Sequence, residues 1–306
     1  MAGAGRRLLK FAGWAVGSIV ILLAVVAVVV VVASNRILAK TVTVPVPVVE
    51  IPIPEGDAAA ITRGKYLVDH VVGCNVCHGP DFGGSAPVDD PMLGTLWAPN
   101  LTTGNGSVTR GFRTTDWLLA IRHGVAPDGR RLFLMPSADF VNFSDGDLGA
   151  IIAYVKSMPP VDRVNRGIRL GPVGRVLVTT HQMKFAFDEI DHLRVAPATK
   201  PSVSPEWGQV LSGTCSGCHG PTYSGGKIPG GDPAWPPARN LTPDETGLKG
   251  WTFDTFATAL RQGKRPDGTT LSTVMPWQQF GGMSDDDMHA LWAFLQTLPA
   301  KPFGNR

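Results

Sequence analysis

The chain has 306 residues, of which 43% are hydrophobic, and its formal net charge at pH 7 is +3. That apolar fraction is enough for a buried core and excludes a wholly disordered chain. The cysteines are too few and too closely paired to staple a chain of this length, which excludes a disulfide framework. No stripe of basic residues interleaved with aromatic residues occurs, so we expect no nucleic-acid binding.

An apolar segment near the N-terminus predicts a membrane anchor. Residues 11–33 contain no charged side chain, and as a helix they would extend about 34 Å, enough to cross a hydrocarbon layer of roughly 30 Å. Arg6, Arg7 and Lys10 precede the segment, so the positive-inside rule places the N-terminus in the cytoplasm. A single-pass protein of the bacterial inner membrane, with its domains on the periplasmic side, is therefore expected. A cleaved signal peptide is the alternative, although its apolar region is usually shorter.

The chain divides into five predicted parts. Residues 1–40 would form a cytoplasmic stub and the anchor, and the proline-rich residues 41–56 a stiff spacer that lifts the first domain off the membrane. Residues 57–160 and 204–306 are the two predicted domains. Residues 161–203 have no counterpart elsewhere and are interpreted as a linker or insert. A passive linker is favoured, and docking between the domains or onto a partner is the alternative.

An internal repeat is the basis for these two domains. A Cys-x-x-Cys-His-Gly-Pro motif at residues 74–80 recurs 141 positions later at residues 215–221. An Asn-Leu-Thr triplet and a Met-Pro pair recur between the same two regions with an offset of 140. Such a constant spacing indicates two copies of one structural unit.

Helical periodicity predicts the elements within each unit. The first unit should contain helices over residues 57–73, 115–123, and from Ser144 to Pro159, and the second unit over residues 252–262 and from Ser284 to Pro299. Gly124 and Gly263 would end the middle helices, and the serines would cap the last ones. No pair of alternating strands emerges. The predicted fold class is therefore all-α: a transmembrane helix followed by two tandem domains with long loops.

The two Cys-x-x-Cys-His motifs carry the main chemical signal. Their spacing suits covalent c-type haem, because two thiols add to the two vinyl groups of one porphyrin and the adjoining His lies beneath the iron. In the first motif Cys74 and Cys77 would attach the haem and His78 would be the iron ligand. In the second motif the same roles fall to Cys215, Cys218 and His219. A thioredoxin-like pair or half of a zinc site would need a βαβ pattern or further ligands, and neither is present.

Met135 and Met275 are the predicted sixth ligands of the two irons. Each is followed by proline in a loop before the last helix, and this repetition in both units favours a thioether ligand over a packing role. His123 competes in the first unit, but its counterpart is Gln262. Filling both axial positions suits outer-sphere electron transfer and disfavours binding of oxygen or peroxide. No catalytic residue is therefore assigned.

Arg122 and Arg261 recur at the ends of the middle helices. A guanidinium group binds carboxylates with two hydrogen bonds, so these residues are candidate partners of the haem propionates. A solvated helix end is the alternative interpretation.

Together these motifs resemble class I cytochrome c domains over residues 57–160 and about 204–302. Gly64-Lys65-Tyr66-Leu67 and the terminal Ser-Asp-x-Asp-Leu helix add to the resemblance. The chain is similar to the membrane-anchored cytochrome subunits of bacterial alcohol and sugar dehydrogenases, which typically carry three haems, whereas two motifs occur here. The family also implies an aromatic contact where the terminal helices of each domain cross. The candidates for this contact are Tyr66 and Tyr154 in the first unit and Trp207 and Phe294 in the second.

The functional hypothesis is a membrane-tethered cytochrome with two covalently bound haems c, which transfers electrons in a respiratory or dehydrogenase chain. Its expected partners are redox proteins: a dehydrogenase, a quinol-oxidising complex, a soluble cytochrome or a terminal oxidase. An electron carrier or electron-transfer subunit is favoured over an enzyme. A dihaem peroxidase and a haem-bearing assembly subunit are the alternatives.

Overall fold

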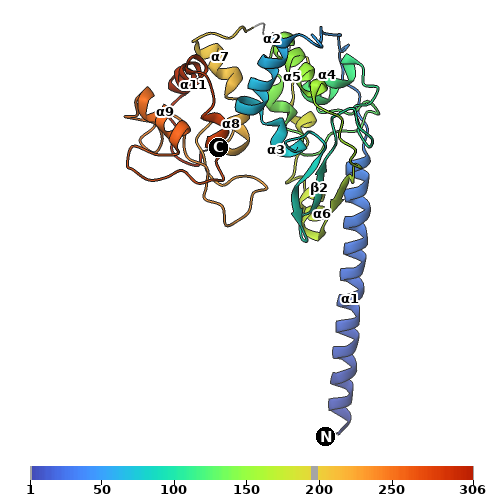
Figure 1. The fold of residues 1–306 in the computed structure, drawn as a ribbon. Coiled ribbons are helices and arrows are strands. Elements are labelled where there is room, and N and C mark those ends of the chain that lie inside the picture. The colour runs from blue at the N-terminus through green and yellow to red at the C-terminus, as the bar shows by residue number, and fades with distance from the viewer. Residues whose placement is uncertain (1, 194–198, 306) are drawn as a thin grey trace.

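A computed structural model describes residues 2–193 and 199–305 of the chain (Figure 1). Its N-terminal helix α1 (Ala2–Ala39) projects as a single rod from the rest of the molecule. Within the described residues, this is the one helix long and apolar enough to cross a membrane, over Lys10–Ala39, and no residue of its most apolar stretch is buried. These properties agree with the predicted anchor.

The remaining helices form two similar sets. The first repeat contains α2 (Ala58–Leu67), the π-helix η1 (Val68–Val72), α3 (Cys74–His78), α4 (Thr114–His123), the 3-10 helix η2 (Ser137–Phe140) and α5 (Asp145–Ser157). The second repeat contains α7 (Pro205–Leu211), α8 (Gly213–His219), α9 (Phe253–Gln262), α10 (Trp277–Phe280) and α11 (Asp285–Thr297). The predicted helices are confirmed to within a few residues at most boundaries, although the first helical stretch of each repeat is divided.

The predicted helix ends also form for the expected reasons. Gly124 and Gly263 follow α4 and α9, and each has a left-handed φ of 67°, which glycine adopts without strain. Ser144 and Ser284 cap α5 and α11 because their hydroxyls accept hydrogen bonds from backbone N–H groups three residues on.

The first and last helices of each repeat cross at a glycine. A Cβ added at Gly64 in α2 would lie 2.0 Å from the carbonyl oxygen of Ala150 in α5. A Cβ added at Gly208 in α7 would lie 2.0 Å from the carbonyl oxygen of Ala290 in α11. Only glycine permits this separation between the two backbones.

The aromatic contacts near these crossings differ from the expected pairs. The Tyr154 ring meets Phe82 edge to face at 5.9 Å, and the Phe294 ring meets Tyr223 at 5.6 Å. Tyr66 and Trp207 turn instead toward the boundary between the repeats, which is described below. The reason is that glycine brings the helices too close for two large rings to lie between them.

The prediction of an all-α fold is wrong in one respect, because the structure contains a small antiparallel sheet in the order β1-β2-β3. Strands β1 (Ser85–Asp90) and β2 (Gly94–Ala98) form a hairpin with an irregular register near Ser85. The third strand, β3 (Ile168–Leu170), comes from the segment interpreted as a linker. A proline in β1 and a partner strand far along the chain hide this sheet from a local pattern.

The same segment packs against the anchor. Helix α6 (Pro172–Thr179) follows β3 and lies beside the upper part of α1, while the 3-10 helix η3 (Ala186–Glu189) lies against η2. A separate hydrophobic cluster joins β2, β3, α6 and α1 and consists of Leu96, Phe133, Leu170, Val178 and Phe185, with Ile37 and Leu38 partly buried against it. These are the contacts of a packed insert and not of a passive linker.

The expected spacer is extended, but it does not lift the first repeat away from α1. Val42 N–H donates to the carbonyl of Gly129, and Ile51 is buried in the main core. Lys156 of α5 forms an ion pair with Glu55. Proline favours the extended conformation, while the apolar residues between the prolines attach the segment to the surface of the repeat.

Candidate functional site

Each Cys-x-x-Cys-His motif forms a short helix that begins with the first cysteine or just before it. In α3 the cysteines are Cys74 and Cys77 and the helix ends at His78. Helix α8 presents Cys215, Cys218 and His219 in the same order. A helical turn places both thiols of a pair and the histidine on neighbouring positions of one surface.

The two histidines are oriented by equivalent hydrogen bonds. His78 Nδ1 lies 2.9 Å from the carbonyl oxygen of Pro99, and His219 Nδ1 lies 2.6 Å from that of Arg239. Donation from Nδ1–H to a carbonyl leaves Nε2 unprotonated, which is the tautomer that binds a metal. Burial lowers the pKa of His78 and further favours the neutral ring.

The thiols lie in an apolar environment. Burial raises the pKa of Cys74 to about 12, and burial together with the nearby Asp139 and Cys218 does the same for Cys215. Both thiols therefore remain protonated at neutral pH. In residues 2–193 and 199–305, no three His, Cys, Asp or Glu side chains lie close enough together to hold a metal ion. Two thiols, an oriented imidazole and apolar surroundings fit a haem group attached through thioether bonds.

The two predicted methionine ligands have the same local structure. Met135 precedes Pro136 and η2, and Met275 precedes Pro276 and α10; the two prolines have ψ angles of 53°. The carbonyl oxygens of both methionines accept a hydrogen bond from the N–H group two residues on. Each methionine is half-buried against the main core. The structure thus gives the two residues one conformation, and their role as iron ligands stays a prediction.

The two repeated arginines both join a middle helix to the start of a last helix. Arg122 Nη2 donates to the carbonyl oxygen of Phe143 at 3.0 Å and to Asp145 at 2.9 Å. Arg261 forms the equivalent ion pair with Asp285. The Nε atom of Arg122 is buried with no hydrogen-bond partner within the described residues, so it can still donate to a further acceptor. A contact with a haem propionate stays a prediction.

His123, the competing ligand of the first repeat, has a different neighbour. Its Nδ1 atom lies 3.0 Å from Nδ1 of His192, which belongs to the insert. Burial, followed by the charges of His192 and Arg122, lowers the pKa of His123 to about 4. The His123 ring is therefore neutral at neutral pH.

Two further buried donors in the second repeat were not predicted from the sequence. Within the described part of the chain, Trp277 Nε1 and Arg265 Nε are buried without a hydrogen-bond partner. The Trp277 ring packs closely on Gly263 at the end of α9. Buried donors require acceptors, and a haem propionate is a suitable one. No repeated motif marks these residues, so only the folded chain reveals them.

The two repeats contact each other at equivalent positions. Asp139 and Gln279 both lie four residues after a predicted methionine ligand. Ser216 in α8 donates to Asp139 Oδ1 at 3.2 Å, and a Cβ added at Gly213 would lie 2.5 Å from the Asp139 carbonyl oxygen. The side chain of Gln279 in turn lies against Gly73, directly before Cys74. The methionine turn of each repeat therefore contacts the cysteine helix of the other.

Asp287 joins the helices on the other side of this boundary. Its carboxylate accepts hydrogen bonds at 2.5 Å from Trp207 Nε1 in its own repeat and from the Tyr66 hydroxyl in the first repeat. Tyr66 also accepts a hydrogen bond from the N–H of Ser284, at the start of α11. The Trp207 ring meets Phe143 of the first repeat edge to face. Polar and aromatic contacts therefore hold the repeats in one orientation.

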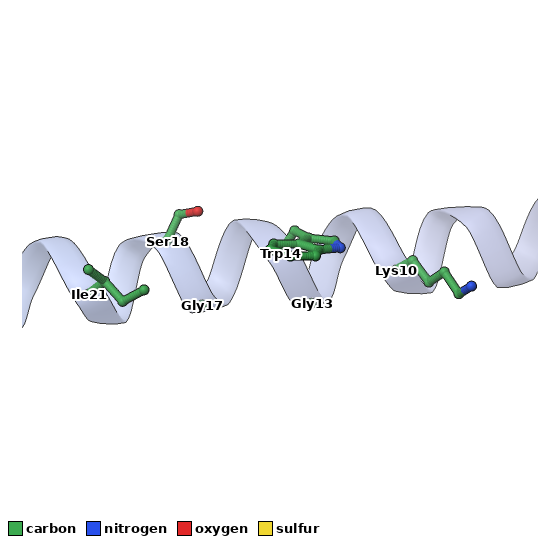
Figure 2. Close-up of a pocket in the computed structure, with 6 residues that line it drawn as sticks. All are labelled: Lys10, Gly13, Trp14, Gly17, Ser18 and Ile21. Carbon is green, nitrogen blue, oxygen red and sulfur yellow. The ribbon is translucent and has the colours of Figure 1, made fainter.

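A groove on the anchor helix is separate from these sites. Figure 2 shows Trp14, Lys10 and Ile21 beside Gly13 and Gly17, which leave the surface of α1 open. An added Cβ at either glycine would meet nothing within 4 Å. The groove consists of small residues on one exposed helix and carries no chemical group of the predicted haem sites.

Cysteine pairs on short helices, oriented histidines, methionine–proline turns and crossed terminal helices are typical of cytochrome c domains. Residues 206–299 match the family model described as Cytochrome c, and this region is a cytochrome c domain.

Known relatives extend the similarity over most of the chain. The chain is 26% identical to the cytochrome c subunit of alcohol dehydrogenase (quinone) from Gluconacetobacter polyoxogenes, over 81% of this chain and 58% of that protein. It is 27% identical to the gluconate 2-dehydrogenase cytochrome c subunit of Pantoea cypripedii, over 81% of this chain and 61% of the relative. A diheme cytochrome c-type protein of Cereibacter sphaeroides is 23% identical, over 74% and 82%. The chain thus spans about three fifths of the length of the dehydrogenase subunits. These matches confirm the resemblance to cytochrome c subunits of dehydrogenases.

Proposed function

We propose that this chain is a membrane-tethered cytochrome with two covalently bound haems c that transfers electrons for a membrane-bound dehydrogenase or another part of a respiratory chain. The observation that carries the proposal is the repeated donor set. Cys74, Cys77 and His78 on α3 have counterparts on α8 in the same order, and Nδ1 of each histidine lies within hydrogen-bond distance of a backbone carbonyl oxygen.

The residues of each site would hold and orient the haem and would not catalyse a reaction themselves. The cysteines hold the porphyrin, and the hydrogen bond from Nδ1 of His78 or His219 keeps Nε2 directed for iron binding. Met135 and Met275 would hold the iron through their thioether sulfurs, which would favour ferrous iron and raise the reduction potential. When bound, haem supplies one-electron redox chemistry. A haem held by these protein ligands would suit electron transfer to and from other redox groups.

The contacts between the two repeats support electron transfer between the two predicted haems of the chain. Asp139 contacts α8, and Gln279 contacts the residue that precedes α3. Both predicted haem-attachment helices therefore touch the opposite repeat. A fixed contact of this kind would keep the two redox centres at a constant separation, so electrons could pass between them without a diffusive encounter.

Helix α1 and the known relatives support a location at the bacterial inner membrane, together with dehydrogenase partners. Helix α1 is long enough to cross a bilayer, and its basic N-terminal end favours a cytoplasmic N-terminus. The haem domains would then lie on the periplasmic side of a bacterial inner membrane. A dehydrogenase is the proposed electron donor, because the relatives are named as subunits of such enzymes. A quinol-oxidising complex, a soluble cytochrome and a terminal oxidase are the other proposed redox partners.

Purification of the full chain from membranes, with its maturation machinery present, tests this proposal. We expect two haems per chain by the pyridine haemochrome assay and a methionine–iron charge-transfer band from both ferric haems. The double variants Cys74→Ser/Cys77→Ser and Cys215→Ser/Cys218→Ser should each abolish covalent attachment of one haem, whereas Met183→Ala, a change outside the predicted sites, should keep both. One haem per wild-type chain, high-spin haem or rapid consumption of peroxide would contradict the proposal.

A further inference from the structure

The insert and the first repeat both contact the outer end of α1. Arg175 in α6 donates to Ser34 Oγ at 2.8 Å and to Asn35 Oδ1 at 2.9 Å. Nearby, Arg131 donates to the carbonyl oxygen of Ile37 at 3.1 Å, and its guanidinium is nearly fully buried. Ser34 is completely buried by these contacts. The repeat is therefore fixed to the helix rather than tethered through a flexible segment.

These contacts determine how far α6 lies from the membrane centre. About 20 helical residues cross a hydrocarbon layer of roughly 30 Å, so a span that starts at Phe11 reaches the outer boundary near Val30. Ser34 and Asn35 are the first polar side chains beyond that boundary. The charge on Arg175 also requires a polar environment and cannot lie in hydrocarbon. Helix α6 therefore lies at the level of the lipid headgroups.

The outward surface at this level is apolar. Val173 and Val176 lie one turn apart on α6 and are 37% and 46% exposed, whereas Gly174 and Val178 of the same helix are buried. Met92, which is 53% exposed, lies beside them because its carbonyl oxygen accepts a hydrogen bond from Val173 N–H at 2.9 Å. Figure 1 shows α6 and the adjoining end of β2 beside α1, on the side of the repeat that faces the N-terminal end of that helix. We call Met92, Val173 and Val176 the α6 patch.

We propose that the α6 patch inserts into the outer surface of the lipid bilayer beside α1. The proposal rests on the anchoring role proposed for α1. Continuity with the membrane-spanning helix favours lipid over a protein partner, because the patch lies at the depth where the bilayer surrounds that helix. Exposed charges of both signs flank it, with Arg169 on β3 and Asp89 and Asp90 on β1. Insertion should therefore depend on apolar contact and not on anionic lipid.

A second contact with the membrane has a mechanical consequence. A single helix allows the attached domain to tilt and rotate, whereas two contacts restrict both movements. The first repeat would then hold its predicted haem site at one height above the bilayer, on the side where redox partners embedded in the membrane could approach.

Spin labels on single introduced cysteines test the patch in the full-length protein with its haems attached. The labelled variants are Met92→Cys and Val176→Cys in the patch, Val20→Cys in the span, and Val164→Cys as a solvent control that is 75% exposed. Unmodified protein should take up no label, because thioether bonds occupy its cysteines. Each variant is reconstituted into phosphatidylcholine nanodiscs, and its accessibility to oxygen and to a water-soluble nickel chelate is measured by power saturation.

We expect the ratio of oxygen to nickel accessibility at positions 92 and 176 to be several-fold higher than at position 164 and lower than at position 20. Adding phosphatidylglycerol should leave these ratios unchanged. Ratios at 92 and 176 equal to that at 164, or labels shielded from both reagents by protein, would overturn the proposal. A span label at position 20 without lipid character would instead refute the anchor itself, so the two failures are distinguishable.

Discussion

Replacing Gly64 by alanine tests whether backbone contact holds the terminal helices of the first repeat together. In the folded chain the new methyl carbon would lie 2.0 Å from the Ala150 carbonyl oxygen and 2.8 Å from Cβ of Tyr154. Unstrained carbon–oxygen contacts lie at roughly 3.3–3.6 Å. Helix α2 or α5 must therefore move by more than 1 Å (roughly 3.3 minus 2.0) for this contact to become acceptable.

Two opposing effects determine how much Gly64→Ala changes the free energy of unfolding. Overpacking of a well-packed core costs about 1–3 kcal/mol, and the upper end applies because a backbone carbonyl cannot rotate away. Replacing glycine by alanine within a helix contributes about 1 kcal/mol in the other direction. We therefore expect Gly64→Ala to lower the free energy of unfolding by roughly 2 kcal/mol. Gly208→Ala should have a similar effect on the second repeat, since its Cβ meets Ala290 in the same way.

Guanidinium unfolding of the haem-loaded protein in detergent measures the change, with circular dichroism reporting the helices and the Soret band reporting each haem environment. Gly146→Ala is the matched control, because its nearest neighbour, Ser144 Oγ, would lie 3.8 Å from the new carbon. This control should be neutral or slightly stabilising. Equal stability of Gly64→Ala and wild type would refute the inference that the crossing depends on direct backbone contact.

Three further predictions concern the sites and the boundary between the repeats. Met135→Ala and Met275→Ala should each lower the reduction potential of one haem only, and a redox titration showing two unchanged potentials would refute both assignments. Burial raises the pKa of Asp139 to about 7, so the folded protein keeps this proton to higher pH than the unfolded chain. Stability should fall as the pH rises from about 4 through about 7, by at most roughly 4 kcal/mol, and pH-dependent melting should lose this decline in Asp139→Asn. Asp287→Ala leaves the buried indole N–H of Trp207 unpaired and should cost roughly 2–4 kcal/mol in denaturant unfolding; an unchanged midpoint would contradict a stabilising role.

Much of the site could be predicted from local sequence. Cysteine spacing within one helical turn specifies a pair of thiols beside a histidine, and the repetition of Met135 and Met275 distinguishes them from other methionines. The ends of the main helices were predictable for the same reason, since Ser144 and Gly124 act through their own backbone neighbourhoods. The apolar run of α1 needs no partner to be recognised.

Contacts between distant segments were decided by the tertiary structure alone. Strand β3 completes a sheet that begins some 80 residues earlier at Ser85. Arg175 binds Ser34, which lies 141 residues earlier in the chain. Tyr66, expected within its own repeat, bonds to Asp287 in the other. The physical reason is that local propensity and periodicity specify which elements form and which face is apolar. Which apolar faces and polar groups then satisfy one another depends on the packing of the whole chain.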